Sequence, residues 1–304
     1  MTPGPVEIVE VAPRDGLQAE DVVLPTEVKV ELIQRLVAAG AKRIEVCSFV
    51  NPARVPQMAD AEAVLDGLGA APHGVTYIGL VLNRRGFDRA VDAGLTEINV
   101  VAAATDTFAE RNQGTTSDGS LQVFEELAPL AVDAGIRPTI TISVSFGCPY
   151  EGEVPVRRVV DIAARAVAAG AAEIAVADTI GVASPPDVRE VLEGVGEAIG
   201  DSDDSVSLRA HFHTTRNTGL ANAWAAVEAG VDALDASLGG IGGCPFAPGA
   251  TGNIPTEDLA YLLERAGVAS GLHLGELIEI VPWIEEQLGA RVPGLLSKAG
   301  LFPK

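Results

Sequence analysis

Hydrophobic and polar positions along the chain form two alternating patterns: long segments with apolar residues every three or four positions, and short runs rich in Val, Ile and Leu. The first pattern predicts amphipathic helices and the second predicts buried strands. Glycine closes a helix readily because it adopts the left-handed conformation without a steric penalty. Five helix-like segments end in an Ala-Gly pair shortly before a β-rich run, at Ala39-Gly40, Ala93-Gly94, Ala134-Gly135, Ala169-Gly170 and Ala229-Gly230.

Three further β-rich runs, near residues 6–11, 75–82 and 208–213, bring the predicted strands to eight. Eight βα units in roughly 250 residues are typical of a (β/α)8 TIM barrel and fit an open doubly wound sheet less well. The segment from Leu274 to Leu288 has apolar residues at helical spacing and precedes a Pro-Gly break. We therefore expect a single domain over residues 1–304, with a barrel over about 5–266 and additional C-terminal helices over about 267–304.

Two predicted strands carry polar residues on one face. Residues 139–145 read Thr-Ile-Thr-Ile-Ser-Val-Ser, and Glu45 stands two positions before Cys47. Successive side chains of a strand point to opposite faces, and one face of a barrel strand meets the surrounding helices. The polar face is therefore predicted to point into the barrel, with Glu45 and Cys47 on the same side.

Composition excludes several classes of partner. The 304 residues are 47% hydrophobic and carry a net charge of −21, which suits a large folded core. Nucleic acids and acidic membrane surfaces require basic patches, so neither is an expected partner. Cys47, Cys148 and Cys244 lie far apart without metal-binding spacing, as expected for thiols in a reducing compartment. Because no signal-like or membrane-spanning apolar run occurs, we expect a cytoplasmic protein.

Polar side chains gather at the predicted carboxyl ends of the strands, where TIM-barrel enzymes carry their active sites. His211 and His213 alternate along one strand, so their imidazoles point the same way. Together with Asp15 after the first strand, they offer one anionic oxygen and two nitrogens. This donor set favours Mg²⁺ or Mn²⁺ over Zn²⁺ or another transition metal. Asn253 is a candidate fourth ligand, and is equally well interpreted as the N-cap of the next helix.

Lysine is absent from these predicted strand ends, which argues against a Schiff base. If the barrel makes or breaks a carbon–carbon bond, it should therefore use a metal as Lewis acid. The glycine-rich segment 239–253 has two interpretations, a phosphate cradle or a mobile lid that carries Cys244 over the site. The only lysines of the chain are Lys29, Lys42, Lys298 and Lys304.

Five motifs occur in one order along nearly the whole chain. They are 9–18 (VEVAPRDGLQ), 48–50 (SFV) with 55–58 (VPQM), 148–152 (CPYEG), 178–181 (DTIG) and the Gly-Gly-Cys-Pro loop at 242–245. In these motifs the chain closely resembles the 3-hydroxy-3-methylglutaryl-CoA (HMG-CoA) lyase family. The resemblance implies a metal-dependent lyase of leucine degradation, a homodimer by family likeness. Its substrate would be HMG-CoA or a close 3-hydroxyacyl-CoA, cleaved to acetyl-CoA and acetoacetate or the matching ketoacid.

The resemblance also implies roles for individual residues. Arg14 would stabilise the negative charge on the thioester carbonyl, Asp15 or His213 would accept the hydroxyl proton, and Cys244 would help return a proton to the acetyl carbanion. The implied metal ligands are Asp15, His211, His213 and Asn253, the supporting acids Glu45 and Asp178, and the substrate contacts Gln18 and Arg54. Arg54, Arg84 and Arg85 are candidates for the phosphates of CoA.

The chain departs from the family after His213, where the lyases read Asp-Thr-Tyr-Gly-Gln and this chain reads Thr-Thr-Arg-Asn-Thr. We expect the metal site to survive this change and the acyl-group specificity to differ. Arg216 either pairs with the free carboxylate of the acyl group, or points into solvent or toward a neighbouring acid.

Two other functions fit part of the sequence. A Claisen-type synthase that condenses acetyl-CoA with a 2-keto acid would share Arg14-Asp15 and the histidine pair, but it would not require the Gly-Gly-Cys-Pro loop. Such synthases usually carry a further C-terminal domain. A non-catalytic, metal-stabilised binding barrel is the other alternative.

Overall fold

The computed structural model describes residues 4–200, 206–243 and 252–302. Eight of its strands build one sheet: β1 (Glu7–Glu10), β2 (Arg43–Ser48), β3 (Thr76–Val81), β4 (Glu97–Ala103), β5 (Arg137–Ser143), β8 (Glu173–Asp178), β9 (Ser207–Phe212) and β10 (Ala233–Ala236). The short strands β6 (Gly147–Cys148) and β7 (Gly152–Glu153) form a separate antiparallel pair after β5.

Helices separate the strands along the chain. They are α1 (Thr26–Ala38), α2 (Ala61–Leu68), α3 (Arg84–Asp92), α4 (Asp106–Gln113), α5 (Ser117–Asp133), α6 (Val156–Ala168), α7 (Pro185–Gly200), α8 (Gly219–Glu228), α9 (Thr256–Arg265), α10 (Leu274–Leu288) and α11 (Leu296–Ala299). Three short helical turns are η1 (Ala12–Gly16), η2 (Pro56–Met58) and η3 (Leu238–Gly240).

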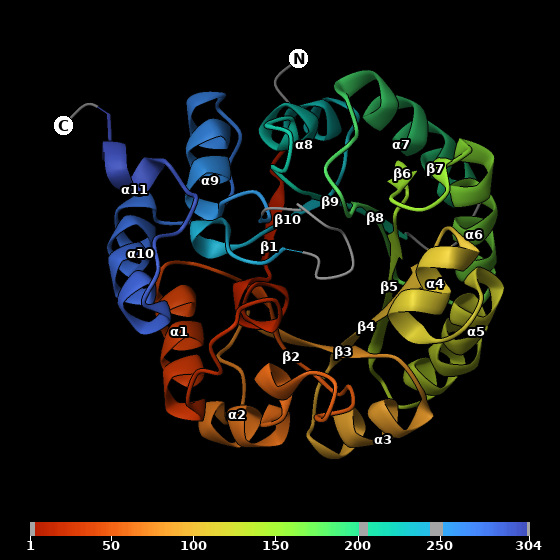
Figure 1. Cartoon of the computed structure of the whole chain (residues 1–304), viewed down its shortest axis with the longest axis horizontal. Coiled ribbons are helices and arrows are strands. Elements are labelled where there is room, and N and C mark those ends of the chain that lie inside the picture. The colour runs from red at the N-terminus through yellow and green to blue at the C-terminus, as the bar shows by residue number, and fades with distance from the viewer. Residues whose placement is uncertain (1–3, 201–205, 244–251, 303–304) are drawn as a thin grey trace.

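The eight parallel strands close into a barrel in the order β1-β10-β9-β8-β5-β4-β3-β2, and the helices form a ring around it (Figure 1). The predicted (β/α)8 barrel with additional C-terminal helices is confirmed. The C-terminal helix α10 packs against α1 and α9, which brings the first and last parts of the chain side by side. None of the described helices is long and apolar enough to cross a membrane.

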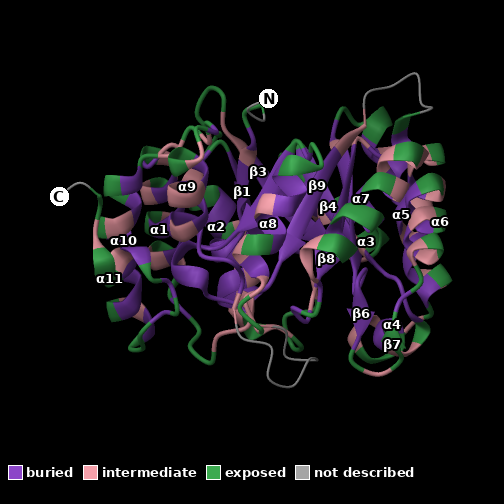
Figure 2. Cartoon of the chain, turned by 90° about the horizontal axis from the view of Figure 1, so that it is seen from above, coloured by how far each residue is buried: buried purple, intermediate pink, exposed green. Residues whose placement is uncertain are grey.

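The predicted helix ends have the expected backbone conformation. All five glycines of the Ala-Gly pairs have positive φ, from 71° at Gly135 to 98° at Gly40 and Gly170. Each helix therefore stops at its glycine, and the next strand begins within a few residues. The main hydrophobic core lies between the strands and the helices, where buried faces of both meet (Figure 2).

The inside of the barrel is polar along β5, as the sequence predicted. The Thr139 hydroxyl donates to the carbonyl of Ile98, and the Thr141 hydroxyl donates to the Asn99 side chain on β4 at 3.1 Å. Ser143 lies on the wall of a cavity at the carboxyl ends of the strands. Hydrogen bonds between strands thus satisfy the polar groups that this face buries.

The inner face of β2 differs from the expectation. The pairing of β2 with β3 shifts between Glu45, which pairs with Ile78, and Cys47, which pairs with Gly79. Ile78 belongs to a small apolar cluster inside the barrel, so Gly79 faces the helices. Cys47 lies in the main hydrophobic core between the strands and the helices. The expectation that it shares the face of Glu45 is wrong because a β-bulge inserts one residue between them.

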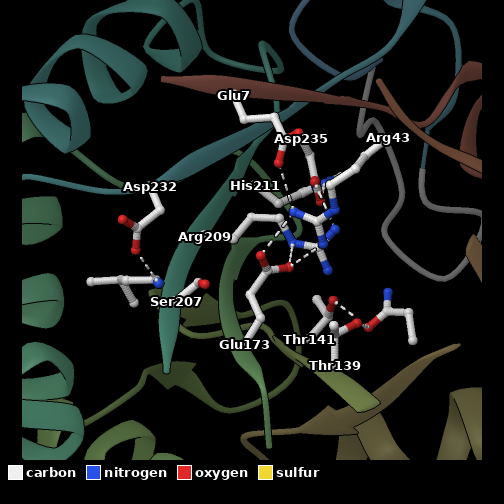
Figure 3. Close-up of polar contacts among 12 residues, drawn as sticks. Glu7, Arg43, Thr139, Thr141, Glu173, Ser207, Arg209, His211, Asp232 and Asp235 are labelled. Carbon is white, nitrogen blue, oxygen red and sulfur yellow. Dashed lines mark hydrogen bonds and ion pairs between the residues drawn. The ribbon is translucent and has the colours of Figure 1, made fainter. Parts of the chain in front are cut away.

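Charged residues fill the amino-terminal end of the barrel (Figure 3). Arg43 on β2 donates to both carboxylate oxygens of Glu173 on β8 at 2.9 Å, and it also pairs with Glu97 and with Glu7. Arg209 on β9, whose side chain is 1% exposed, lies 3.0 Å from Glu173. Unpaired buried charges cost several kcal/mol each. These ion pairs therefore stabilise the amino-terminal end of the barrel, which lies opposite the carboxyl ends of the strands.

We predict that Glu173→Gln lowers the free energy of unfolding by about 3–5 kcal/mol, because it leaves two buried arginines with one carboxylate fewer. Burial alone would raise the pKa of Glu173, but Arg209 and Arg43 lower it to about 2. Because the folded-state pKa lies below the ordinary glutamate pKa of 4.5, the stabilisation is complete above pH 4.5 and is lost as the pH falls toward 2. Urea denaturation of parent and variant at several pH values measures this difference.

The control is Glu31→Gln, which removes an exposed ion pair with Arg35 on α1. It should change stability by less than about 0.5 kcal/mol. Equal losses in the two variants, or a loss for Glu173→Gln that does not shrink at acid pH, would contradict the assignment.

Candidate active site

The turn η1 after β1 carries Arg14 and Asp15 at the carboxyl end of the barrel. Arg14 Nη1 donates to Asp15 Oδ1 at 2.7 Å, and Arg14 Nη2 donates to Glu45 Oε2. The loop after β10 packs closely on this turn, since a Cβ at Gly16 would lie 2.7 Å from Ile241. Gly16 thus permits the contact that holds the arginine and the aspartate between two loops.

The histidine pair lies beside this turn. His211 is on β9 and His213 follows it, and their Nε2 atoms are 3.0 Å apart. The Nδ1 atom of His211 is 3.1 Å from Asp235 Oδ2 on β10, a contact drawn in Figure 3. Because a carboxylate only accepts hydrogen bonds, Asp235 places the proton of His211 on Nδ1 and leaves Nε2 available as a ligand.

The donor atoms fit a divalent cation. Ligand atoms of Asp15, His211 and His213 all lie within 4.8 Å of one another. Asn253, which is 1% exposed, donates from Nδ2 to Asp15 Oδ2 at 2.9 Å and to the carbonyl of Ile241 at 3.1 Å. Its Oδ1 is buried and has no hydrogen-bond partner. A buried acceptor without a donor is costly, and a metal ion would satisfy it.

The alternative interpretation of Asn253 was a helix cap. Helix α9 begins at Thr256 after Pro255, without a capping side-chain hydrogen bond. The Asn253 amide instead faces Asp15. Asn253 is therefore not the cap of α9, and its role as a metal ligand stays a prediction.

The charges around the site set the protonation of the metal-free side chains. Burial alone would raise the pKa of Asp15, but Arg14 and the two histidines lower it to about 2. Burial, with a smaller contribution from His211, lowers the pKa of His213 to about 3. Burial opposes the charge of Arg14, yet Glu45 and Asp15 raise its pKa above the normal value. At neutral pH the site therefore offers a carboxylate, a neutral imidazole at His213 and a permanent cation.

The two expected supporting acids occupy different positions. Glu45 is buried beneath Arg14, which it holds by an ion pair. Asp178, at the end of β8, accepts hydrogen bonds from the backbone N–H groups of Val182 and Ala183 at 2.9 and 3.0 Å. Burial raises the pKa of Asp178, and these two N–H groups partly offset it. In this geometry Asp178 shapes the turn after β8.

A cavity of about 680 Å³ opens at the carboxyl ends of the strands. Its wall combines the charged residues of the site with an apolar part that includes Leu80, Leu82 and Val101. Of the expected site residues, those on the described wall are Arg14, Asp15, Gln18, Arg54, His211 and His213.

Other expected substrate contacts lie away from this wall. Arg216 is exposed, and its Nη1 donates to the backbone carbonyls of Ile180 and Gly181 in the loop after β8 at 2.7 and 3.1 Å. Arg84 pairs with Asp88 on the exposed face of α3. Arg85 is exposed. Cys244 lies outside the described residues, so its lid and proton-transfer roles stay predictions.

Two residues of this network escaped the sequence analysis. Asp235 and Asn99 each stand within a buried β-rich run, where a carboxylate or an amide needs a partner. A polar residue inside an otherwise apolar strand was the signal in the sequence that could have identified both residues. Their partners, His211 and Glu45, come from other strands and become visible only in the closed barrel.

Comparisons with known proteins find one family over nearly the whole chain. A model of the HMGL-like family matches residues 5–284. The (R)-citramalyl-CoA lyase of Chloroflexus aurantiacus is 44% identical, with 98% of this chain and 96% of the relative covered. The hydroxymethylglutaryl-CoA lyase of Bacillus subtilis is 38% identical, with 96% of each chain covered.

Solved structures show the same likeness. The Bacillus subtilis HMG-CoA lyase structure matches with a TM-score of 0.92 at 37% identity over 98% of both chains. An Acinetobacter baumannii HMG-CoA lyase, solved in complex with coenzyme A and 3-methylmalate, matches with a TM-score of 0.93 at 38% identity over 99% of this chain and 96% of that one. This likeness in sequence and fold over nearly the whole chain shows that the protein belongs to the HMGL-like family of carbon–carbon lyases.

Proposed function

We propose that this chain is a divalent-metal-dependent lyase that cleaves HMG-CoA, or a close tertiary 3-hydroxyacyl-CoA, to acetyl-CoA and a ketoacid. One observation carries the proposal: the Arg14 guanidinium and the group formed by Asp15, His211 and His213 lie on the wall of one cavity. The coenzyme A in the Acinetobacter baumannii relative supports an acyl-CoA substrate. A role in leucine degradation, a homodimer and a cytoplasmic location stay predictions.

The reaction requires two kinds of stabilisation. The 3-hydroxyl loses its proton, the bond between C2 and C3 breaks, and C3 becomes the ketone of the ketoacid. The electron pair of the broken bond passes to C2 and spreads onto the thioester oxygen. The resulting enolate then takes up a proton at C2 to give acetyl-CoA. The barrier therefore depends on removing the hydroxyl proton and on stabilising charge at the thioester oxygen.

Residues of this chain meet both needs. Arg14 is held by Asp15 and Glu45 and stays charged, so it can stabilise the thioester oxygen without rearranging. Asp15 or His213 accepts the hydroxyl proton. Asp15, His211, His213 and Asn253 would hold Mg²⁺ or Mn²⁺, with Zn²⁺ less favoured by this donor set. When bound, such an ion supplies Lewis acidity that lowers the pKa of the substrate hydroxyl.

Substrate binding extends from this centre. Gln18 and Arg54 lie on the cavity wall, where Arg54 can reach a phosphate of CoA. A synthase or a non-catalytic barrel is less well supported, because relatives that match nearly the whole chain are named lyases.

A second substrate is favoured by one observation. The Chloroflexus aurantiacus relative, 44% identical, is a citramalyl-CoA lyase. Citramalyl-CoA is one methylene shorter than HMG-CoA, and its cleavage gives pyruvate in place of acetoacetate. The same arginine and metal ligands serve both cleavages, so the choice depends on how the cavity receives the distal carboxylate.

Product analysis distinguishes the two substrates. Protein purified with Mn²⁺ should release acetyl-CoA and acetoacetate from HMG-CoA. A larger kcat/KM for release of pyruvate from citramalyl-CoA would assign the second substrate. Absence of acetyl-CoA from both esters would contradict the proposed function.

We predict that chelation abolishes turnover and that Mg²⁺ or Mn²⁺ restores it, because no lysine of the described barrel lies on the cavity wall to replace the electrophile. Asn253→Leu should weaken Mn²⁺ binding by about 10- to 100-fold in a calorimetric titration, the scale for a lost supporting interaction at a metal. Full activity of metal-free protein, or trapping of substrate on a lysine by borohydride, would overturn this prediction.

We further predict that Arg14→Gln lowers kcat by about a hundredfold or more, the typical loss for one donor to a developing oxyanion. Mn²⁺ binding should remain, since Arg14 is not a ligand. Arg84→Gln is the matched control, because Arg84 is exposed and lies off the cavity wall. Steady-state assays of both variants test this, and an Arg14→Gln enzyme within a few-fold of the parent would exclude Arg14 from the mechanism.

A further inference from the structure

Asn99 is an unusual residue for its position. It lies in the middle of β4, inside the barrel, and is 3% exposed. Asparagine is disfavoured in strands, and a buried amide costs free energy unless both its ends are hydrogen-bonded. Both ends of Asn99 are occupied: Nδ2 donates to Glu45 Oε1 at 3.2 Å, and Oδ1 accepts from the Thr141 hydroxyl at 3.1 Å.

These partners fix the orientation of the amide. Glu45 accepts the guanidinium of Arg14 through Oε2, so its carboxylate presents an acceptor at Oε1 as well. The amino group of Asn99 must therefore face Glu45, and its carbonyl must face the Thr141 hydroxyl. Thr141 lies beside Thr139 on the inner face of β5, and its hydrogen bond is drawn in Figure 3.

The contacts continue from Asn99 to the cavity. Glu45 holds Arg14, and Arg14 in turn donates to Asp15. Arg14 and Asp15 line the described cavity, whereas Asn99 and Glu45 are absent from its wall. Asn99 is thus two contacts from the Arg14 guanidinium through Glu45, and it also contacts Thr141 on the cavity wall.

We propose that Asn99 is a positioning residue that sets the direction of the Arg14 guanidinium by fixing the carboxylate of Glu45. The catalytic meaning of this inference rests on the proposed function of Arg14. With Oε1 held by the amide, only Oε2 is free to receive Arg14. If the amide is removed, the buried Oε1 of Glu45 loses its donor. The carboxylate can then rotate so that both of its oxygens accept from Arg14. That rotation would draw the guanidinium away from the thioester oxygen.

The first test is Asn99→Leu, which keeps the approximate shape and removes the amide. We expect kcat to fall by about 10- to 100-fold, the range for a hydrogen bond to a charged group, while KM changes by less than about threefold. Mn²⁺ affinity should stay within about twofold. Ser145→Ala is the control, because it removes a buried hydroxyl that donates to the Ile142 carbonyl and makes no contact with Asn99 or Glu45 among the described hydrogen bonds. Its kcat should stay close to that of the parent.

A double-mutant cycle separates positioning from general damage. If Asn99 acts through Glu45, Asn99→Leu should lower kcat no further in a Glu45→Gln background. Losses that multiply in the double variant, or an equal loss of kcat in Ser145→Ala, would overturn the proposal. Asn99→Val removes the amide without adding a charge and suits a strand, so it provides the same test if Asn99→Leu does not fold.

Crystal structures of the parent and of Asn99→Leu give a readout that does not depend on turnover. The Arg14 guanidinium should move relative to Glu45 and Asp15 in the variant. An unmoved guanidinium would overturn the positioning role even if the parent cleaves HMG-CoA. An inactive parent with a displaced guanidinium in the variant would instead contradict the proposed function alone.

Discussion

Charged side chains inside the barrel must pair with one another, and the position of the active site depends on this pairing. At the amino-terminal end, Glu173 joins Arg43 to Arg209. Arg209 Nη1 also lies 3.2 Å from Asp235, and Asp235 contacts His211 at the opposite end. Figure 3 shows these residues as one continuous group. Ion pairs therefore connect the amino-terminal end of the barrel to the end that holds the candidate metal ligands.

A second set of contacts fixes the other half of the site. Arg14 pairs with Asp15 at the cavity and with Glu45 below it, and Asn253 reaches Asp15 from the loop after β10. Arg14, Asp15 and Asn253 are thus each held by a neighbour on another element. The arginine and the candidate ligands Asp15 and Asn253 are therefore held in place without a substrate, which is the condition for effective electrostatic catalysis.

Local patterns were sufficient to predict the architecture, and they also singled out Asp15, His211 and His213, which the barrel brings together. The Ala-Gly pairs mark helix ends by a conformational rule, and the spacing of His211 and His213 follows from strand geometry. Features that depend on strand register were not predictable: the bulge that turns Cys47 outward, and the pairing of Asp235 with its histidine. The contact of Arg216 with two carbonyls likewise depends on where the loop after β8 lies.

The central claim is that four side chains from three separate parts of the chain converge on one divalent cation. Anomalous diffraction from crystals grown with Mn²⁺ tests it most directly. We expect one strong peak at the carboxyl end of the barrel. It should mark a Mn²⁺ ion bound by Asp15, by the Nε2 atoms of His211 and His213, and by the amide oxygen of Asn253. A peak bound by other residues, or no peak at saturating Mn²⁺, would contradict it.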